Sequence, residues 1–209
     1  MPTALITGVS RGLGKELARQ YAADGWKVIG TGRKDMDMTD VAQIRRFAAK
    51  LKDEAIDLLF CNAGISGKKG MAPGSFDFDS WQEVLRVNLL GPAALAEALL
   101  DNVAASGKKT IAMMSSRLGS ISESSGMTLP YSTSKAALNM LVKGLAATLA
   151  SRNIVVVALS PGWVRTDMGG ASAPLSPEKS VQGLRQVIAG LRNEHSGKFF
   201  SHDGTEIPW

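Results

Sequence analysis

Short apolar runs alternate along this chain with longer amphipathic segments. The runs are rich in Ile, Val, Leu or Met and mostly lack polar alternation, which is typical of strands buried on both faces of a sheet. They cover residues 4–7, 27–31, 57–61, 110–114, 154–160 and 198–200.

Helical patterns separate these runs. Apolar side chains recur on one stripe over residues 12–24 and 41–51. Asp79 or Ser80 can cap a long helix through residue 100, Pro130 opens another through 150, and Ser176-Pro177 starts a last one to about 191. The alternation predicts an α/β fold class: a single doubly wound parallel sheet (Rossmann fold) with helices on both faces, in one domain over residues 1–209.

Composition narrows the class of protein. The chain has 209 residues, 44% of them hydrophobic and 21% charged, which excludes extensive disorder. The single cysteine, Cys61, cannot form an internal disulfide and fits a reducing compartment. No apolar run approaches the roughly 20 residues of a membrane helix, and the first residues lack the pattern of a secretory signal. We expect a cytoplasmic protein without a membrane partner.

The net charge of +5 arises beyond residue 104. No run of Lys or Arg exceeds two residues, and neither a zinc-ligand spacing nor a helix-turn-helix signal accompanies them. We therefore expect neither nucleic-acid binding nor a metal site.

The first predicted strand runs directly into Thr7-Gly8-Val9-Ser10-Arg11-Gly12-Leu13-Gly14, and a predicted helix follows. Gly8 permits a tight turn, Gly12 lets the backbone approach a pyrophosphate, and Gly14 allows the helix to pack closely on the sheet. The free amides and the dipole of the helix would stabilise the phosphate charge. Three glycines could also merely close a loop, but their position after the first strand favours phosphate binding.

Tyr131 and Lys135 lie four residues apart at the start of a predicted helix, so their side chains share a face. A nearby ammonium group lowers the pKa of a tyrosine, as a general acid near neutral pH requires. A surface pair is the alternative, because this spacing also arises by chance. The pair follows a strand and Ser115-Ser116, which brings the phenol back to the sheet edge of the glycine turn.

Together these residues resemble the short-chain dehydrogenase/reductase family. The glycine turn has the family spacing, and Cys61-Asn62-Ala63-Gly64 looks like its Asn-Asn-Ala-Gly segment, with cysteine for the first Asn. Val87-Asn88-Leu89 is similar to the helix that carries the family's catalytic Asn. Ser115-Ser116, Tyr131 and Lys135 are similar to its Ser, Tyr and Lys. Residues 160–168 are similar to the Pro-Gly segment that closes over the nicotinamide. Residues 114–121 and the ending with Pro208-Trp209 are similar to C-factor-like and sniffer-like carbonyl reductases.

The resemblance implies reversible hydride transfer between a nicotinamide dinucleotide and a small carbonyl compound or alcohol. Tyr131 would give its proton to the carbonyl oxygen, and Lys135 would lower the pKa of Tyr131 and bind the nicotinamide ribose. Ser116, in preference to Ser115, would hold the substrate oxygen. The cofactor would contact Gly8, Ser10, Arg11, Gly12, Leu13, Gly14, Arg33, Asp37, Met38, Asn62, Ala63, Gly64, Tyr131, Lys135, Pro161, Gly162, Val164 and Thr166.

Asn88 lies inside a predicted helix, with Pro92 four residues further on. Because proline has no N–H, the carbonyl of Asn88 loses its partner and the helix should kink. We hypothesise that this carbonyl holds a water that connects Lys135 to solvent, which is the proton relay of the family. The alternative is that Gly91-Pro92 only bends a long helix around the core.

Arg11 and Arg33 indicate the choice of cofactor. No acid follows the second strand until Asp35, whereas family members that bind NAD have an acid at the strand end. Two cations suit the 2′-phosphate of NADP(H), which we expect to be preferred, with NAD(H) still open. A solvated Arg33 is the alternative.

The chain is short after the second strand. The family places a helix and most of a third strand before the segment 36–40, and only residues 32–35 are available here. A parallel crossover needs about a dozen residues, so the helix should be missing and the third strand lost or reduced.

A second hypothesis is a dinucleotide-binding signalling or regulatory module with little turnover, because C-factor-like relatives suggest it. The presence of Asn88, Ser116, Tyr131 and Lys135 together favours an enzyme. The long helices at 79–103 and 130–150 are those that the family uses for dimer contacts, so a homodimer or homotetramer is open. His195 and His202 are expected at the surface, away from the motifs.

Overall fold

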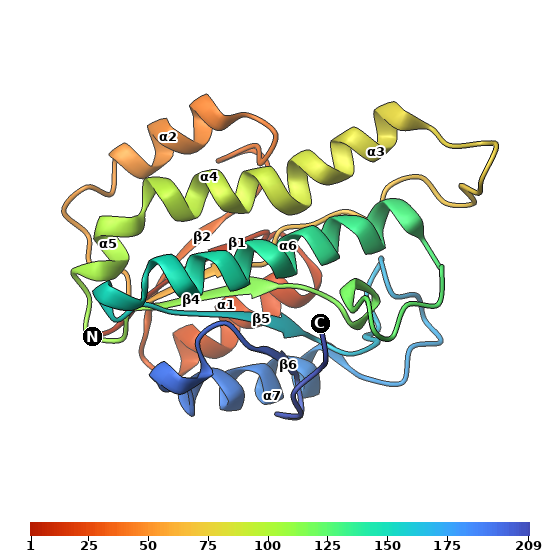
Figure 1. Ribbon diagram of the computed structural model, residues 1–209. Helices are drawn as coiled ribbons and strands as arrows, with labels where there is room; N and C mark the ends of the chain where they lie inside the picture. Colours follow the sequence, from red (N-terminus) through yellow and green to blue (C-terminus); the bar gives the residue numbers. More distant parts are fainter.

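A single six-stranded parallel sheet runs through the computed structural model, which describes residues 1–209 (Figure 1). The strand order is β2-β1-β3-β4-β5-β6, so the order turns back at β1. The predicted fold class is confirmed, and each predicted strand is present. The strands are β1 (Thr3–Thr7), β2 (Lys27–Thr31), β3 (Leu58–Cys61), β4 (Thr110–Met114), β5 (Val155–Ser160) and β6 (Phe199–Ser201).

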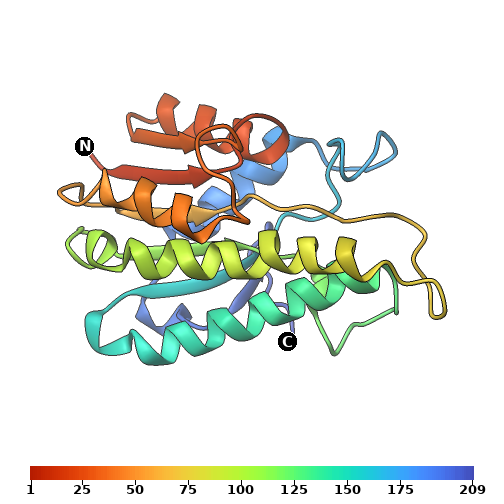
Figure 2. The same cartoon turned by 90° about the horizontal axis from the view of Figure 1, so that it is seen from above.

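Helices cover both faces of the sheet (Figures 1 and 2). α1 (Gly12–Ala23) and α7 (Pro177–Ala189) pack on one face over a core of 14 buried residues. The other face carries a core of 23 buried residues beneath α2 (Val41–Ala49), α4 (Gly91–Ala98), α5 (Leu100–Ala104) and α6 (Leu129–Thr148). Side chains of β1 enter both cores, which explains why the strands read as unbroken apolar runs. None of the helices combines the length and apolarity needed to cross a membrane.

One of the predicted helix caps is present in the structure, and another is not. Ser176 caps α7, where its side chain accepts a hydrogen bond from the amide of Lys179 at 3.3 Å. The expected cap at Asp79 or Ser80 is wrong: α3 (Phe78–Leu85) is capped by Asp77, two residues before Asp79, and the carboxylate of Asp77 accepts from the amide of Ser80 at 3.0 Å. The carboxylate of Asp77 can cap the helix as well as Asp79 or Ser80 could, so the local sequence alone did not show which of these residues is the cap.

No strand follows β2 at the edge of the sheet, as predicted. The chain instead makes a tight turn, in which the amide of Gly32 donates to the carboxylate of Asp35 at 2.8 Å. Met36 and Met38 then enter the larger core, at 2% and 7% exposure. A Cβ on Gly91 would lie 2.5 Å from the main-chain oxygen of Met38, so only glycine lets α4 come this close. Two buried methionines thus pack this short connection onto the larger core.

Pro92 produces a wide turn within a long helix. Between α3 and α4, residues Arg86–Leu90 form a π-helical turn (η1), in which the amide of Gly91 donates to the carbonyl of Arg86. Figure 1 shows α3 and α4 as successive parts of one long helix. The predicted irregularity is present as an inserted residue, which is a common way to accommodate a missing amide donor.

The carboxyl ends of the strands lie at one edge of the sheet. Thr7 of β1 pairs in register with Thr31 of β2, and Met114 of β4 pairs with Leu159 of β5. The segments that follow these strands meet at this edge, next to the point where the strand order turns back. That position is where ligands bind in open α/β sheets.

Candidate active site

The glycine turn between β1 and α1 is built as the sequence indicates. Gly8 and Gly12 have positive φ angles of 77° and 55°, and the amide of Gly8 donates to the carbonyl of Thr31 at 2.7 Å. A Cβ on Gly14 would lie 2.1 Å from the oxygen of Gly8, so this helix can approach the turn only with glycine there. No side chain caps α1 at Arg11. The first amides of the helix are therefore open to an anion such as a phosphate.

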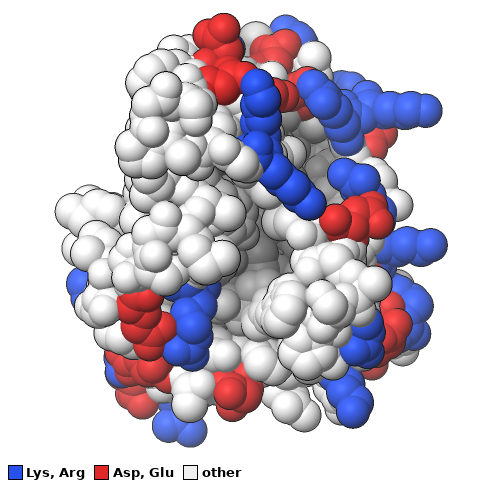
Figure 3. Space-filling model, turned by 90° about the vertical axis from the view of Figure 1, so that its right-hand side faces the viewer, with Lys and Arg blue, Asp and Glu red and all other residues white.

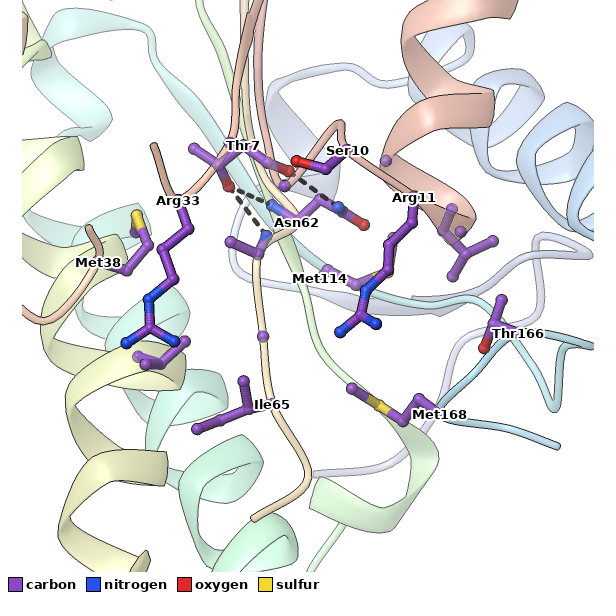
Figure 4. A pocket seen from close by; sticks show the side chains of 18 of the residues that line it. Thr7, Ser10, Arg11, Arg33, Met38, Asn62, Ile65, Met114, Thr166 and Met168 are labelled. Carbon is purple, nitrogen blue, oxygen red and sulfur yellow. Dashed lines mark hydrogen bonds between the residues drawn. The ribbon is translucent and has the colours of Figure 1, made fainter. Parts of the chain in front are cut away.

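Asn62 ties the segment after β3 to the glycine turn. Its side-chain amide donates to the oxygen of Thr7 at 2.9 Å, and the hydroxyl of Thr7 accepts from the main-chain amides of Asn62 and Ala63 at 3.0 and 2.9 Å. Figure 4 shows these bonds at the head of the cavity. A Cβ on Gly64 would lie 3.2 Å from the side-chain oxygen of Asn88 and 3.5 Å from the Lys135 ammonium nitrogen, so the segment passes close to both side chains.

Tyr131 stands at the start of α6 beside Ser116. Burial raises the pKa of the Tyr131 phenol to about 12, and hydrogen bonding with the Ser116 hydroxyl lowers it in part. The phenol therefore keeps its proton at neutral pH, as a proton donor must. The hydroxyl of Ser115 points elsewhere, into a buried hydrogen bond of 2.6 Å with Asn139. Ser115 lines the cavity and Ser116 does not, so the preference for Ser116 as the substrate-binding serine stays a prediction that rests on its hydrogen bond with Tyr131.

Lys135 is 3% exposed, and its ammonium group donates to the carbonyl of Met114 at 2.8 Å. Burial lowers its pKa to about 8. The nitrogen lies 5.5 Å from the centre of the Tyr131 ring. The expected effect of Lys135 on the pKa of Tyr131 is not seen in this arrangement, because the lysine bonds to a main-chain oxygen and desolvation dominates the phenol.

Asn88 is fully buried in the π-helical turn, and its side chain is committed to neighbouring groups. Its side-chain oxygen Oδ1 accepts from the main-chain amide of Ile65 at 2.9 Å. Its side-chain NH₂ donates to the main-chain oxygen of Ile65 at 2.9 Å and to the Ser134 hydroxyl at 3.0 Å. The side chain thus fixes the segment after β3 against α6. The role of the Asn88 main-chain carbonyl in a proton relay stays a prediction.

These segments enclose a cavity of about 350 Å³. Figure 3 shows a hollow on this face, with uncharged side chains over much of its wall and lysines and arginines at its rim. The predicted residues that line it are Gly8, Ser10, Arg11, Gly12, Leu13, Gly14, Arg33, Asp37, Met38, Asn62, Ala63, Gly64, Tyr131, Lys135, Pro161 and Thr166.

Some predicted residues do not line the cavity. Asn88 and Ser116 do not line the cavity, and neither do Gly162 and Val164. Val164 is buried and forms a bridge with Leu175, so it supports the segment after β5 from behind. Ile65, Met114 and Met168 also line the cavity, although none of them was among the predicted contact residues. Met114 ends β4, and the other two lie in segments that follow β3 and β5, so their place at the carboxyl ends of strands is the one signal that could have indicated them.

Two arginines reach into the cavity from opposite sides, as Figure 4 shows for Arg11 and Arg33. Arg11 pairs with Asp167 at 2.9 Å, and Arg33 pairs with Asp37 at 3.3 Å. Both arginine side chains are 79% exposed, so these pairs contribute little stability and leave the guanidinium groups free to turn to an anion. Hydrogen bonds from Thr39 lower the pKa of Asp37, which holds this carboxylate charged.

Cys61 and His202, for which we expected no catalytic role, lie in different surroundings. Burial raises the pKa of Cys61 to about 12, which agrees with an inert core thiol. His202 is not a remote surface residue, because a Cβ on Gly162 would lie 3.2 Å from its ring. The expectation for His202 is therefore wrong, since β6 runs beside β5 and brings its end to the segment that follows Ser160.

The fold and the site together define a nucleotide-binding α/β protein of the Rossmann type. The family model of the short chain dehydrogenases matches residues 2–174, and the chain belongs to this family. It is therefore an oxidoreductase of a family that uses NAD(P) and acts on small-molecule substrates.

Similar proteins extend this comparison. The C-signal of Myxococcus xanthus is 40% identical over 167 residues, which cover 79% of this chain and all of that protein. The NADPH-bound carbonyl reductase from chicken fatty liver has a TM-score of 0.89 and 27% identity, over 100% of this chain and 99% of that one. The carbonyl reductase Sniffer of D. melanogaster has a TM-score of 0.88 and 30% identity over all of both chains. The predicted resemblance, including the subgroup, is confirmed.

We expect Gly14→Ala to reduce the free energy of unfolding by about 1–3 kcal/mol, because the new methyl group would overlap the oxygen of Gly8 and the amide of Asn62. Chemical denaturation measures the effect. The control is Gly144→Ala on α6, where a Cβ meets nothing within 4 Å and helix propensity predicts a gain of about 0.5–1 kcal/mol. Equal effects of the two changes would contradict the crowding at Gly14.

Proposed function

We propose that this protein reduces aldehydes or ketones to alcohols, or catalyses the reverse reaction, with NADP(H) as its preferred cofactor. The observation that carries the proposal is that Tyr131 and buried Lys135 line the glycine-rich cavity, with the Ser116 hydroxyl hydrogen-bonded to the Tyr131 phenol. The crowded glycine cradle and the uncapped start of α1 fit a dinucleotide pyrophosphate. The carbonyl reductases of similar structure support the reaction class.

Each residue has a task in this proposal. The dinucleotide, when bound, supplies or takes up the hydride at its nicotinamide. Ser116 holds the substrate oxygen, and Tyr131 donates its phenolic proton to that oxygen during reduction. Lys135 carries a positive charge below about pH 8 and compensates the negative charge that the phenol acquires. Asn88 keeps the segment after β3 against α6, and its main-chain carbonyl holds a water that returns the proton from solvent.

The test is a panel of aldehydes, ketones and quinones incubated with NADPH, with its absorbance followed over time. We expect turnover of at least one uncharged carbonyl compound, because neutral side chains form much of the wall of the hollow in Figure 3. Absence of turnover across the panel, by protein that binds NADPH, would contradict the proposed function.

A second candidate is a dinucleotide-binding signalling or regulatory module with little turnover, which the 40% identity to the C-signal favours. The two candidates differ in their need for the phenol. A Tyr131→Phe protein that binds the cofactor and still performs the function of the wild-type protein in cells would favour signalling. Loss of that function in cells would favour catalysis.

We expect the preference for NADPH over NADH to depend on Arg33. In Arg33→Ala, kcat/KM for NADPH should fall about tenfold or more, because a charge-assisted hydrogen bond to the 2′-phosphate is lost, while kcat/KM for NADH stays nearly unchanged. Arg46→Ala, which removes an exposed cation of α2 outside the cavity, is the matched control. A wild-type preference for NADH would refute the cofactor assignment.

A further inference from the structure

The segment 207–209, which we call the strap, folds back along β6. The amide of Ile207 donates to the carbonyl of Phe199 at 2.8 Å, and the Ile207 side chain is buried in the larger core. The Trp209 ring stacks on Phe199 with 5.6 Å between centroids, and the ammonium group of Lys143 lies 5.7 Å from the Trp209 centroid. Packing from two elements therefore fixes the position of the strap.

The strap accepts hydrogen bonds from the loop that follows β4. The hydroxyl of Ser120, itself 1% exposed, donates to the oxygen of Pro208 at 2.7 Å. The amide and the hydroxyl of Ser122 donate to the main-chain oxygen of Trp209 at 3.0 and 2.7 Å. Figures 1 and 2 both show this end of the chain beside the loop. Three hydrogen bonds thus join the strap to a loop nearly 90 residues away in the sequence.

The anchored loop carries Ser116. The 3₁₀ turn η2 (Arg117–Gly119) follows this serine, whose hydroxyl accepts from the amide of Leu118 at 3.2 Å. A Cβ on Gly119 would lie 2.7 Å from the Cβ of Lys135, so the turn rests directly on the α6 backbone. The oxygen of Gly119 also accepts from Asn139 at 3.1 Å. A displacement of the turn would therefore move Ser116 relative to both Tyr131 and Lys135.

We propose that Trp209 and Ser120 are positioning residues, which act through the strap to hold Ser116 beside the Tyr131 phenol. The proposal rests on the proposed carbonyl reduction. Residues 121–128 of the loop between Ser116 and Tyr131 are exposed. The strap gives the start of this loop three hydrogen bonds, through Ser120 and Ser122.

The kinetic test compares four variants. Trp209→Ala should lower kcat/KM for the carbonyl substrate about tenfold, because small misplacements of a reacting group are costly, and Ser120→Ala should lower it severalfold. The Kd for NADPH should stay within about twofold in both, because neither residue lines the cofactor cavity. Trp209→Phe, which can still stack on Phe199, should restore most of the activity. Ser125→Ala, in the exposed part of the same loop, should change nothing.

Amide hydrogen exchange tests the anchor without any substrate. The amide of Ser122 should lose protection in Trp209→Ala and keep it in Ser125→Ala. Loss of this protection with unchanged carbonyl kinetics would overturn the positioning role, as would an equal loss of NADPH affinity and carbonyl turnover in Ser120→Ala. Absence of turnover by the wild-type protein would instead defeat the proposed function, and the exchange result would still report whether the strap holds the loop.

Discussion

Replacing Tyr131 by phenylalanine is expected to lower kcat for carbonyl reduction by about 10²–10⁴-fold, the usual contribution of a general acid. The change removes one hydroxyl and leaves the ring, so the cavity keeps its shape. The NADPH Kd should change by no more than a few fold, because the glycine turn and the arginines are untouched. Stopped-flow hydride transfer and a fluorescence titration with NADPH measure the two quantities separately.

The only other tyrosine of the chain, Tyr21, provides a matched control for Tyr131→Phe. Tyr21 is 3% exposed on α1, its hydroxyl has no hydrogen-bond partner, and it lies outside the cofactor cavity. Tyr21→Phe should leave kcat within about twofold, because it removes an unpaired buried hydroxyl and no reacting group. Similar losses in Tyr21→Phe and Tyr131→Phe would show that the hydroxyl at 131 has no special chemical role.

Lys135→Met is expected to inactivate the protein and to stabilise it. Burial lowers the pKa of Lys135 to about 8, so the folded state tolerates its charge less well than the unfolded chain does. A methionine of similar length removes this cost, and we expect a gain of about 1–3 kcal/mol in the free energy of unfolding at pH 7. Denaturation and turnover assays on the same preparations measure both effects.

The pH dependence gives this prediction its sign. In the unfolded chain Lys135 keeps its proton until about pH 10.4, whereas the folded protein releases it above about pH 8. Between these values the unfolded state binds more protons, so the wild-type protein gains stability as the pH rises. The advantage of Lys135→Met should therefore be largest at and below pH 8 and nearly vanish by pH 10.

Lys179→Met is the matched control for this experiment, because Lys179 is an exposed lysine at the start of α7. It should show no comparable change in stability with pH relative to the wild-type protein. A Lys135→Met protein less stable than wild type at pH 7 would contradict a dominant desolvation cost. It would indicate that the hydrogen bond to Met114 outweighs the burial of the charge.

The elements and the phosphate-binding turn could be predicted because their signals are local. Apolar runs without alternation mark buried parallel strands, and glycines at 8, 12 and 14 mark a turn that other residues cannot make. The missing third strand also follows from the chain itself, since too few residues remain after β2 for a crossover. The pair Tyr131 and Lys135 could be placed on one helix face by its spacing alone.

The partners of Ser115 and Ser116 depended on three-dimensional packing, because adjacent residues on an extended segment point to opposite sides and the Ser115 hydroxyl donates to Asn139. The bond from Lys135 to Met114 and the contact of the strap with Ser120 and Ser122 join residues far apart in the sequence. No periodicity or spacing encodes such contacts, because they arise only when separate elements compete for the same space and the same hydrogen-bond donors. The chain alone therefore specifies the glycine turn and the order of elements, while tertiary packing decides which polar groups are free and which are bound to one another at the cavity.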